Sequence, residues 1–135
     1  MSSGDHIVYL VDDDAGVREA LTDLLCSSGF NAVAFGSVAE YLAYSRPQLP
    51  GCLVLDVHMP DINGLEFQSR LAASDPIPVI FITGQGDVPT SVRAIKSGAL
   101  DFLTKPINDE ALLQAVAAGI DRDSKALLDR GLHDR

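Results

Sequence analysis

The stretch "IVYLVDDDAG" (residues 7–16) decides the fold of this chain, because an apolar run ends directly in three aspartates. The apolar half, rich in β-branched residues, is typical of a strand that is buried on both faces. Adjacent carboxylates repel one another, so three of them at a strand end need a cation or a helix cap to offset their charge. The stretch therefore predicts a buried strand that leads into a polar site.

An apolar run followed by a helical segment recurs along the chain. Short apolar or β-branched runs predict strands at residues 6–11, 31–35, 52–57, 77–83 and 100–104. Apolar residues at helical spacing, together with capping residues, predict helices at residues 15–29, 37–45, 63–74, 87–98 and 108–128. This alternation predicts an α/β fold, a doubly wound five-stranded parallel sheet covered by five helices.

The totals exclude several classes of protein. A length of 135 residues favours one domain, and a formal charge of −9 argues against direct binding to nucleic acid or to an anionic membrane. No apolar run approaches the roughly 18 residues that a membrane span needs. The N-terminal residues also lack the pattern of a signal peptide. We expect a cytoplasmic protein that binds a cation or a basic partner.

The two cysteines, Cys26 and Cys52, lie in mainly apolar segments without CxxC spacing. We expect two reduced, partly buried thiols rather than a disulfide or a redox pair.

Polar residues close four of the five predicted strands, at the edge where doubly wound sheets bind ligands. They are Asp12, Asp13 and Asp14 after the first strand, Asp56 in the third, Thr83 in the fourth, and Thr104 and Lys105 before Pro106 in the fifth. Each has a simpler explanation when taken alone, such as a helix cap, strand propensity or a solvated charge. Asp14 is best explained as the cap of the first helix.

The combination of these residue types points to phosphoryl chemistry. Carboxylates from two strands form an oxygen-rich pocket that suits Mg²⁺, with Mn²⁺ as an alternative ion. A threonine hydroxyl and a lysine ammonium beside the metal can hold further phosphoryl oxygens. Asp56 stands alone on its strand and is the candidate nucleophile for a covalent acyl phosphate.

Four segments carry a resemblance to a known family. The segments "VDDD" (11–14), "LDVHMPDINGLEF" (55–67), "VIFITGQGD" (79–87) and "AIKSGALDFLTKP" (94–106) resemble the receiver domain of two-component response regulators. The resemblance covers residue 5 to about residue 122 and implies a flavodoxin-like or CheY-like sheet of order 2-1-3-4-5. Residues 82–106 further resemble the FixJ-type subgroup, whose members join a receiver to a C-terminal helix-turn-helix DNA-binding domain.

The resemblance assigns roles around the acidic pocket. It implies that Asp56 is the phosphoacceptor, that Asp13 binds the metal directly, and that Asp12 binds it largely through water. It adds the backbone carbonyl of His58 as a metal ligand and Lys105 as the phosphate-binding lysine.

The resemblance also implies a conformational switch. Thr83 corresponds to the switch hydroxyl and Phe102 to the switch aromatic, and the Lys105–Pro106 peptide bond is expected to be cis. Phe102 alone would also fit a plain core aromatic. Phosphate would shift the population toward one state of the face formed by the fourth helix and the fifth strand.

His58 and Gln85 depart from the Arg and His that FixJ-type sequences often carry two residues after the phosphoacceptor and the switch threonine. Two interpretations stay open for this pair. It is neutral loop variation, or its bulk and hydrogen bonding set how readily water attacks the acyl phosphate. A solvated His58 and an adventitious transition-metal ligand are further alternatives.

Partners follow from the same resemblance. We expect phosphorylation by a sensor histidine kinase, with no enzyme activity beyond the chain's own phosphorylation and slow autodephosphorylation. Arg93 and Lys96 of the predicted fourth helix and Asp101 of the fifth strand offer complementary charge for a homodimer that phosphorylation enhances.

Two interpretations of the domain organisation of the whole protein stay open. We predict a receiver domain over residues 1–122 and an extension of the last helix, or the start of a linker, over residues 123–135. No helix-turn-helix segment follows, so we expect DNA binding only through a separate C-terminal domain. A stand-alone receiver is the alternative. An aspartyl phosphohydrolase is disfavoured because His58 stands where such an enzyme needs a second carboxylate.

Overall fold

The computed structural model describes residues 5–57, 66–67, 70, 76–84 and 98–133. Five parallel strands form one sheet in the order β2-β1-β3-β4-β5. Their bounds are β1 (Ile7–Val11), β2 (Ala32–Phe35), β3 (Gly51–Asp56), β4 (Val79–Thr83) and β5 (Asp101–Thr104). The predicted parallel sheet and its strand order are confirmed.

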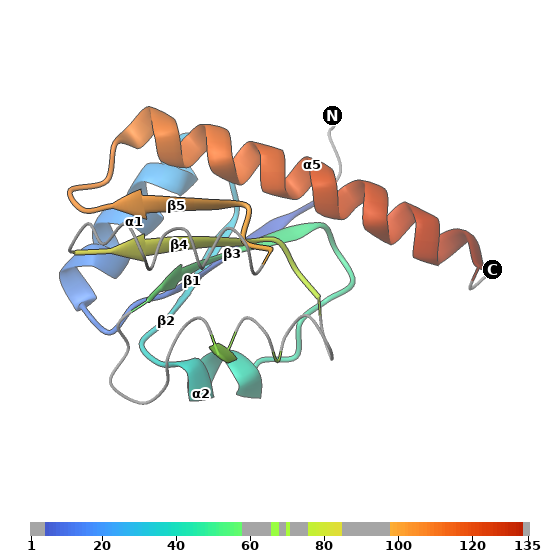
Figure 1. Cartoon of the computed structure of the whole chain (residues 1–135), viewed down its shortest axis with the longest axis horizontal. Coiled ribbons are helices and arrows are strands. Elements are labelled where there is room, and N and C mark those ends of the chain that lie inside the picture. Colours follow the sequence, from blue (N-terminus) through green and yellow to red (C-terminus); the bar gives the residue numbers. More distant parts are fainter. Residues whose placement is uncertain (1–4, 58–65, 68–69, 71–75, 85–97, 134–135) are drawn as a thin grey trace.

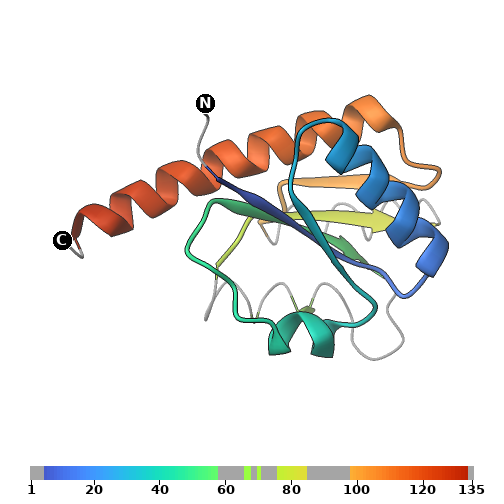
Figure 2. The same ribbon diagram turned by 180° about the vertical axis from the view of Figure 1, so that it is seen from behind.

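Helices cover both faces of this sheet (Figure 1). They are α1 (Ala15–Ser27), α2 (Val38–Ala43) and α5 (Asp109–His133). Figure 2 shows α1 and α5 on one face, with α2 on the other. The predicted helices at 63–74 and 87–98 lie mostly outside the described residues, of which Glu66, Phe67 and Arg70 are helical.

Alternate residues of each central strand enter two separate apolar layers. In β1, Val8 and Leu10 pack with α1 and α5, whereas Tyr9 and Val11 pack toward α2. All four side chains are 0% exposed. A strand that is buried on both faces in this way explains why the run has no polar alternation. The two layers hold the strands rigidly, and so fix the positions of the residues at their carboxyl ends.

Side-chain caps define where the short helices begin. The Asp14 carboxylate accepts hydrogen bonds from the Gly16 and Val17 amides at 2.8 and 3.2 Å, as expected for the cap of α1. The Ser37 hydroxyl accepts from the Glu40 amide at 3.2 Å at the start of α2. Gly29, with φ of +94°, ends α1 in the left-handed conformation that glycine adopts without strain.

Helix α5 continues to His133, past the predicted helix end at residue 128 and into residues 123–135, where we predicted an extension of the last helix or the start of a linker. Asp123 of this helix is buried, and its Oδ2 accepts a hydrogen bond from the Gly51 amide at 2.9 Å. Beyond this contact the helix continues past the amino-terminal edge of the sheet, as Figure 1 shows. The expected domain boundary after residue 122 stays a prediction. In the described part of the chain, no helix is both long enough and apolar enough to cross a membrane.

The two cysteines differ in their environment. Both are free thiols, as expected, but only Cys52 is buried. Cys26 is exposed in the last turn of α1, so the expectation of partial burial is wrong for this residue. Burial raises the pKa of the Cys52 thiol, and the nearby Asp123 carboxylate raises it further. Cys52 therefore acts as an uncharged core residue.

Gly119 lets α5 approach β3 closely. A Cβ at this position would lie 2.7 Å from Cys52 Sγ and 3.2 Å from Leu100 Cδ2. Cys52 is fully buried and has little room to move away from such a Cβ, whereas Leu100 is only partly buried. The absence of a side chain at Gly119 thus sets the distance between the helix and the sheet.

We predict that overpacking in Gly119→Ala costs about 2–3 kcal/mol, the upper part of the usual range. Alanine gains roughly 1 kcal/mol over glycine in a helix, so the free energy of unfolding should fall by about 1–2 kcal/mol in total. Urea denaturation measures the change. Introducing Gly119→Ala into a Cys52→Ala background should cost less, since Sγ is then absent. A Gly119→Ala variant as stable as the parent protein would contradict the prediction.

Candidate functional site

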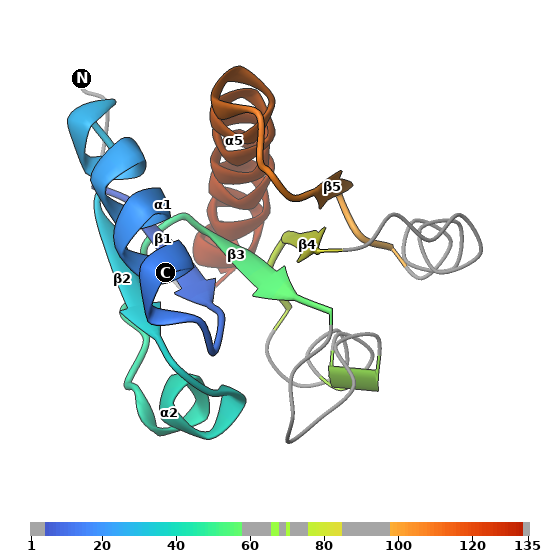
Figure 3. The same cartoon turned by 90° about the vertical axis from the view of Figure 1, so that its left-hand side faces the viewer.

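Polar side chains gather at the carboxyl ends of β1, β3, β4 and β5. Figure 3 looks onto this edge, where the strand arrowheads face the viewer. Asp12 and Asp13 follow β1, Asp56 ends β3, and Lys105 follows β5. The parallel register places these ends side by side, with Val11 opposite Leu55 and Asp56 opposite Ile82. Residues more than forty positions apart in sequence thereby form one site.

Three carboxylates lie close enough to share one cation. One carboxylate oxygen from each of Asp12, Asp13 and Asp56 lies within 4.8 Å of the other two. Asp12 is fully buried and Asp56 is 6% exposed, whereas Asp13 is exposed. An all-oxygen donor set with one open side fits a hard divalent ion that keeps part of its water shell. These residues therefore fit a magnesium-type site.

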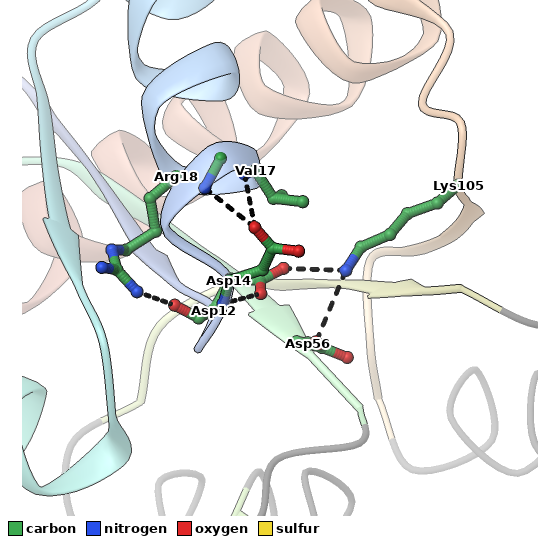
Figure 4. A network of polar contacts seen from close by, with 7 residues as sticks. Asp12, Asp14, Val17, Arg18, Asp56 and Lys105 are labelled. Atoms are coloured by element: carbon green, nitrogen blue, oxygen red, sulfur yellow. Dashed lines mark hydrogen bonds and ion pairs between the residues drawn. The ribbon is translucent and has the colours of Figure 1, made fainter.

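Lys105 contacts two of the three carboxylates (Figure 4). Its Nζ lies 3.0 Å from Asp12 Oδ2 and 3.5 Å from Asp56 Oδ2. Burial alone would lower the pKa of Lys105, but the Asp12 and Asp56 carboxylates outweigh it and leave the pKa above its usual value. The ammonium group therefore stays charged at neutral pH, beside the candidate nucleophile.

Backbone and side-chain bonds hold Asp12 in place. Its Oδ1 accepts from the Asp14 amide at 2.9 Å, and its own amide donates to the Phe35 carbonyl at 3.2 Å. Burial raises the pKa of the Asp12 carboxyl, as does the Asp56 charge, while the Asp14 amide and Lys105 oppose the shift. A cation at this site would favour the ionised form.

The expected switch residues lie on β4 and β5, the two strands that follow β3 in the sheet. Thr83 is 1% exposed at the end of β4, and its carbonyl accepts from the Lys105 amide at 2.7 Å. Phe102 is half-buried on β5, with its ring centroid 6.4 Å from that of Phe81. The Lys105–Pro106 peptide bond is cis. These residues share one region of the structure, and their roles in switching stay predictions.

Several predicted site residues lie outside the described residues. They are His58 and Gln85, which flank the expected approach to the phosphoacceptor, and Arg93 and Lys96 of the expected dimer face. Their assigned roles stay predictions.

The sequence analysis assigned no role to Arg18, which lies beside the site, or to Asp123, which lies on α5. Arg18 donates from Nη1 to the Asp12 carbonyl at 2.7 Å, and Figure 4 shows its side chain turned back toward the β1 end. Arg18 is the only Lys or Arg in the first 45 residues, beside three aspartates. The position of this single positive charge could have marked it as a candidate site residue. Asp123 falls at helical spacing between the apolar positions Ile120 and Leu127, which was the available sign of its burial.

Comparison with known proteins gives a consistent family. The family model described as "Response regulator receiver domain" matches residues 8–117. Nodulation protein W of Bradyrhizobium diazoefficiens is 51% identical over 120 residues, which cover 88% of this chain and 53% of that protein. Transcriptional regulatory protein FixJ of Azorhizobium caulinodans is 45% identical over 119 residues, covering 87% of this chain and 56% of that protein. The chain spans about half the length of these curated relatives.

A solved structure supports the same grouping. The response regulator StyR superposes with a TM-score of 0.88 at 44% sequence identity, covering 97% of this chain and 67% of that one. Sequence identity of this size over nearly the whole chain indicates common family membership and not only a shared fold.

We predict that Mg²⁺ raises the melting temperature of the protein by binding the native acidic cluster. At ten times its dissociation constant, a bound ion stabilises the native state by about 1.4 kcal/mol, which corresponds to several degrees. Differential scanning calorimetry with Mg²⁺ and with EDTA measures the shift.

The test variant is Asp13→Asn. Its control is Asp23→Asn, which alters an exposed acidic residue on α1. Asp13→Asn should shrink the Mg²⁺-induced rise, and should not lower the melting temperature in EDTA because it removes a repelling charge. Asp23→Asn should leave the rise unchanged. An equal rise in all three proteins would place the ion elsewhere.

Proposed function

Because this chain belongs to the response regulator receiver domain family, we propose that Asp56 accepts a phosphoryl group from the phosphohistidine of a sensor histidine kinase. The observation that carries the proposal is the Lys105 ammonium lying 3.0 and 3.5 Å from the Asp12 and Asp56 carboxylates at the carboxyl edge of the sheet. An aspartate nucleophile, a fixed cation and an oxygen-rich pocket are the parts that phosphoryl transfer needs.

In the proposed reaction, an Asp56 carboxylate oxygen attacks the phosphorus while the bond from the histidine nitrogen to phosphorus breaks. The nitrogen keeps the bonding electron pair, and Asp56 becomes an acyl phosphate. Lys105 faces the Asp56 carboxylate, so its ammonium group would pair with an oxygen of the phosphoryl group attached there. The cost of burying the new charge is thereby reduced.

Asp12, Asp13 and Asp56 are the residues that would hold Mg²⁺, or Mn²⁺ in its place, together with the backbone carbonyl of His58. The bound ion supplies charge neutralisation for the phosphoryl oxygens. The hydrogen bond from the Asp14 amide and the ion pair with Lys105 position the Asp12 carboxylate for this role. Water attack on the acyl phosphate would then reverse the modification slowly, with His58 and Gln85 setting its rate.

Phosphorylation is proposed to act through Thr83 and Phe102. Thr83 ends β4 beside the acidic cluster, so a short movement of its hydroxyl would reach a phosphoryl oxygen. Space vacated by Thr83 would then admit the half-buried Phe102 ring toward the core. The exposed face of β5 would change with it, which makes the phosphate a ligand for one conformation.

Control of transcription is the proposed output of the longer protein. The relative from Azorhizobium caulinodans is named a transcriptional regulatory protein, and this chain covers 56% of it. We propose that a C-terminal helix-turn-helix domain of the longer protein binds DNA and responds to the receiver. A stand-alone receiver acting through protein contacts is the alternative.

We predict that a small phosphodonor such as acetyl phosphate adds one phosphoryl group to this protein in the presence of Mg²⁺. Intact mass spectrometry at mildly acidic pH measures the addition. Asp56→Asn should abolish it, because an amide is a poor nucleophile and forms no stable phosphoryl adduct. Asp23→Asn is the matched control and should be labelled like the parent. Equal labelling of Asp56→Asn would refute the assignment.

We predict that the phosphoryl mimic beryllofluoride promotes a homodimer through β5 and the segment 87–98. Asp101, which is half-buried at the start of β5, would meet Arg93 or Lys96 of the second copy. Sedimentation velocity should show a larger species that Asp101→Asn weakens and that the remote Asp121→Asn does not. A monomer that the mimic leaves unchanged would count against this surface.

A further inference from the structure

The Arg18 side chain connects helix α1 to the acidic site. Its backbone amide donates to the Asp14 carbonyl at 3.0 Å, which makes Arg18 part of the first helical turn. Its side chain does not extend into solvent, as an arginine on an amphipathic helix usually does. It turns back toward the end of β1 and is half-buried there.

Among the residues that the structure describes, Arg18 donates a hydrogen bond to a backbone carbonyl. Nη1 donates to the Asp12 carbonyl oxygen at 2.7 Å, a short distance that is typical of a charge-assisted hydrogen bond. This carbonyl belongs to the peptide unit that joins Asp12 to Asp13. Fixing the carbonyl therefore fixes the plane of the peptide between two of the three clustered carboxylates.

Gly36, just after β2, leaves space for the Arg18 guanidinium group. A Cβ at Gly36 would lie 3.2 Å from Arg18 Nη1 and 3.3 Å from Glu40 Oε2. Glycine at this position thus leaves room for the arginine beside the start of α2. The nearby Glu40 carboxylate makes the half-buried positive charge less costly.

The other side of Asp12 is also held. Its amide donates to the Phe35 carbonyl at 3.2 Å, and Phe35 immediately precedes Gly36. The last residue of β2 therefore holds Asp12 through its amide, while Arg18 holds it through its carbonyl. Figure 4 shows the arginine on the opposite side of Asp12 from Lys105.

We propose that Arg18 is a positioning residue for the phosphoacceptor site, which orients the Asp12–Asp13 peptide so that both carboxylates face Asp56. The inference deepens the proposed function and rests on it for the role of the metal. Arg18 itself is assigned no contact with the phosphoryl group or with the ion.

This role makes a prediction opposite in sign to that of a simple charge effect. If Arg18 acted only as a nearby positive charge, its removal would strengthen Mg²⁺ binding, because the cluster would become more negative. If it positions the Asp12–Asp13 peptide, its removal weakens Mg²⁺ binding. The direction of the change therefore separates the two roles.

The test compares Arg18→Met, Arg18→Lys and Arg122→Gln, a matched charge removal at an exposed position on α5. Isothermal titration calorimetry measures the Mg²⁺ dissociation constant of each folded protein. We expect a 5- to 20-fold weakening in Arg18→Met, an intermediate loss in Arg18→Lys, which keeps one donor, and less than a twofold change in Arg122→Gln. Unchanged or tighter Mg²⁺ binding in Arg18→Met would overturn the proposal.

A second measurement needs neither metal nor phosphate. The Asp14 amide donates to Asp12 Oδ1, so its hydrogen exchange in EDTA reports whether Asp12 is held in place. We expect exchange at Asp14 to accelerate at least fivefold in Arg18→Met relative to amides in the middle of β1 and β3, and to stay unchanged in Arg122→Gln. Uniform acceleration along the chain would indicate a general loss of stability and would refute a positioning role.

The two measurements distinguish failure of this inference from failure of the proposed function. If the parent protein binds no Mg²⁺ but Asp14 exchange responds selectively to Arg18→Met, the positioning contact stands and the phosphoacceptor proposal fails. If the parent binds Mg²⁺ and exchange at Asp14 does not respond, the reverse holds.

Discussion

Mutual repulsion among three carboxylates is the constraint around which this structure is organised. Oxygens of Asp12, Asp13 and Asp56 lie within 4.8 Å of one another, and two of the three residues are buried. Such an arrangement is unfavourable in an isolated peptide. It persists here because the two apolar layers fix the strand ends and because Lys105 supplies a positive charge against Asp12 and Asp56. The stability of the apolar core thus maintains a cluster of carboxylates whose mutual repulsion a bound cation would reduce.

The fold was largely predictable from sequence, for physical reasons that particular residues illustrate. The runs ending at Val11 and Asp56 are apolar on both faces, which only a doubly covered sheet accommodates. The capping role of Asp14 was predictable because such a cap depends on local hydrogen bonds alone. The convergence of Asp12, Asp13, Asp56 and Lys105 followed from topology, since parallel strands bring their carboxyl ends to one edge.

What could not be predicted depends on contacts between distant backbone groups. β3 begins at Gly51 because this residue pairs with Ile7, and side-chain patterns do not report such pairing. The end of α5 was misplaced because the residues after 128 are mostly polar, yet their backbone continues the helix. Arg18 was overlooked because its partner is a carbonyl, a group that every residue carries. Roles assigned to His58 and Gln85 rest on resemblance alone.

The attachment of α5 has a mechanical consequence. The helix is held to β3 at two points one turn apart, by the close approach at Gly119 and by the Asp123 carboxylate. β3 also carries Asp56, so the helix and the candidate phosphoacceptor belong to one stiff unit. The ten residues after Asp123, up to His133, extend about 15 Å beyond the second attachment, at 1.5 Å per residue. A reorientation of β3 by roughly 5° would therefore carry the helix with it and displace the helix tip by about 1.3 Å.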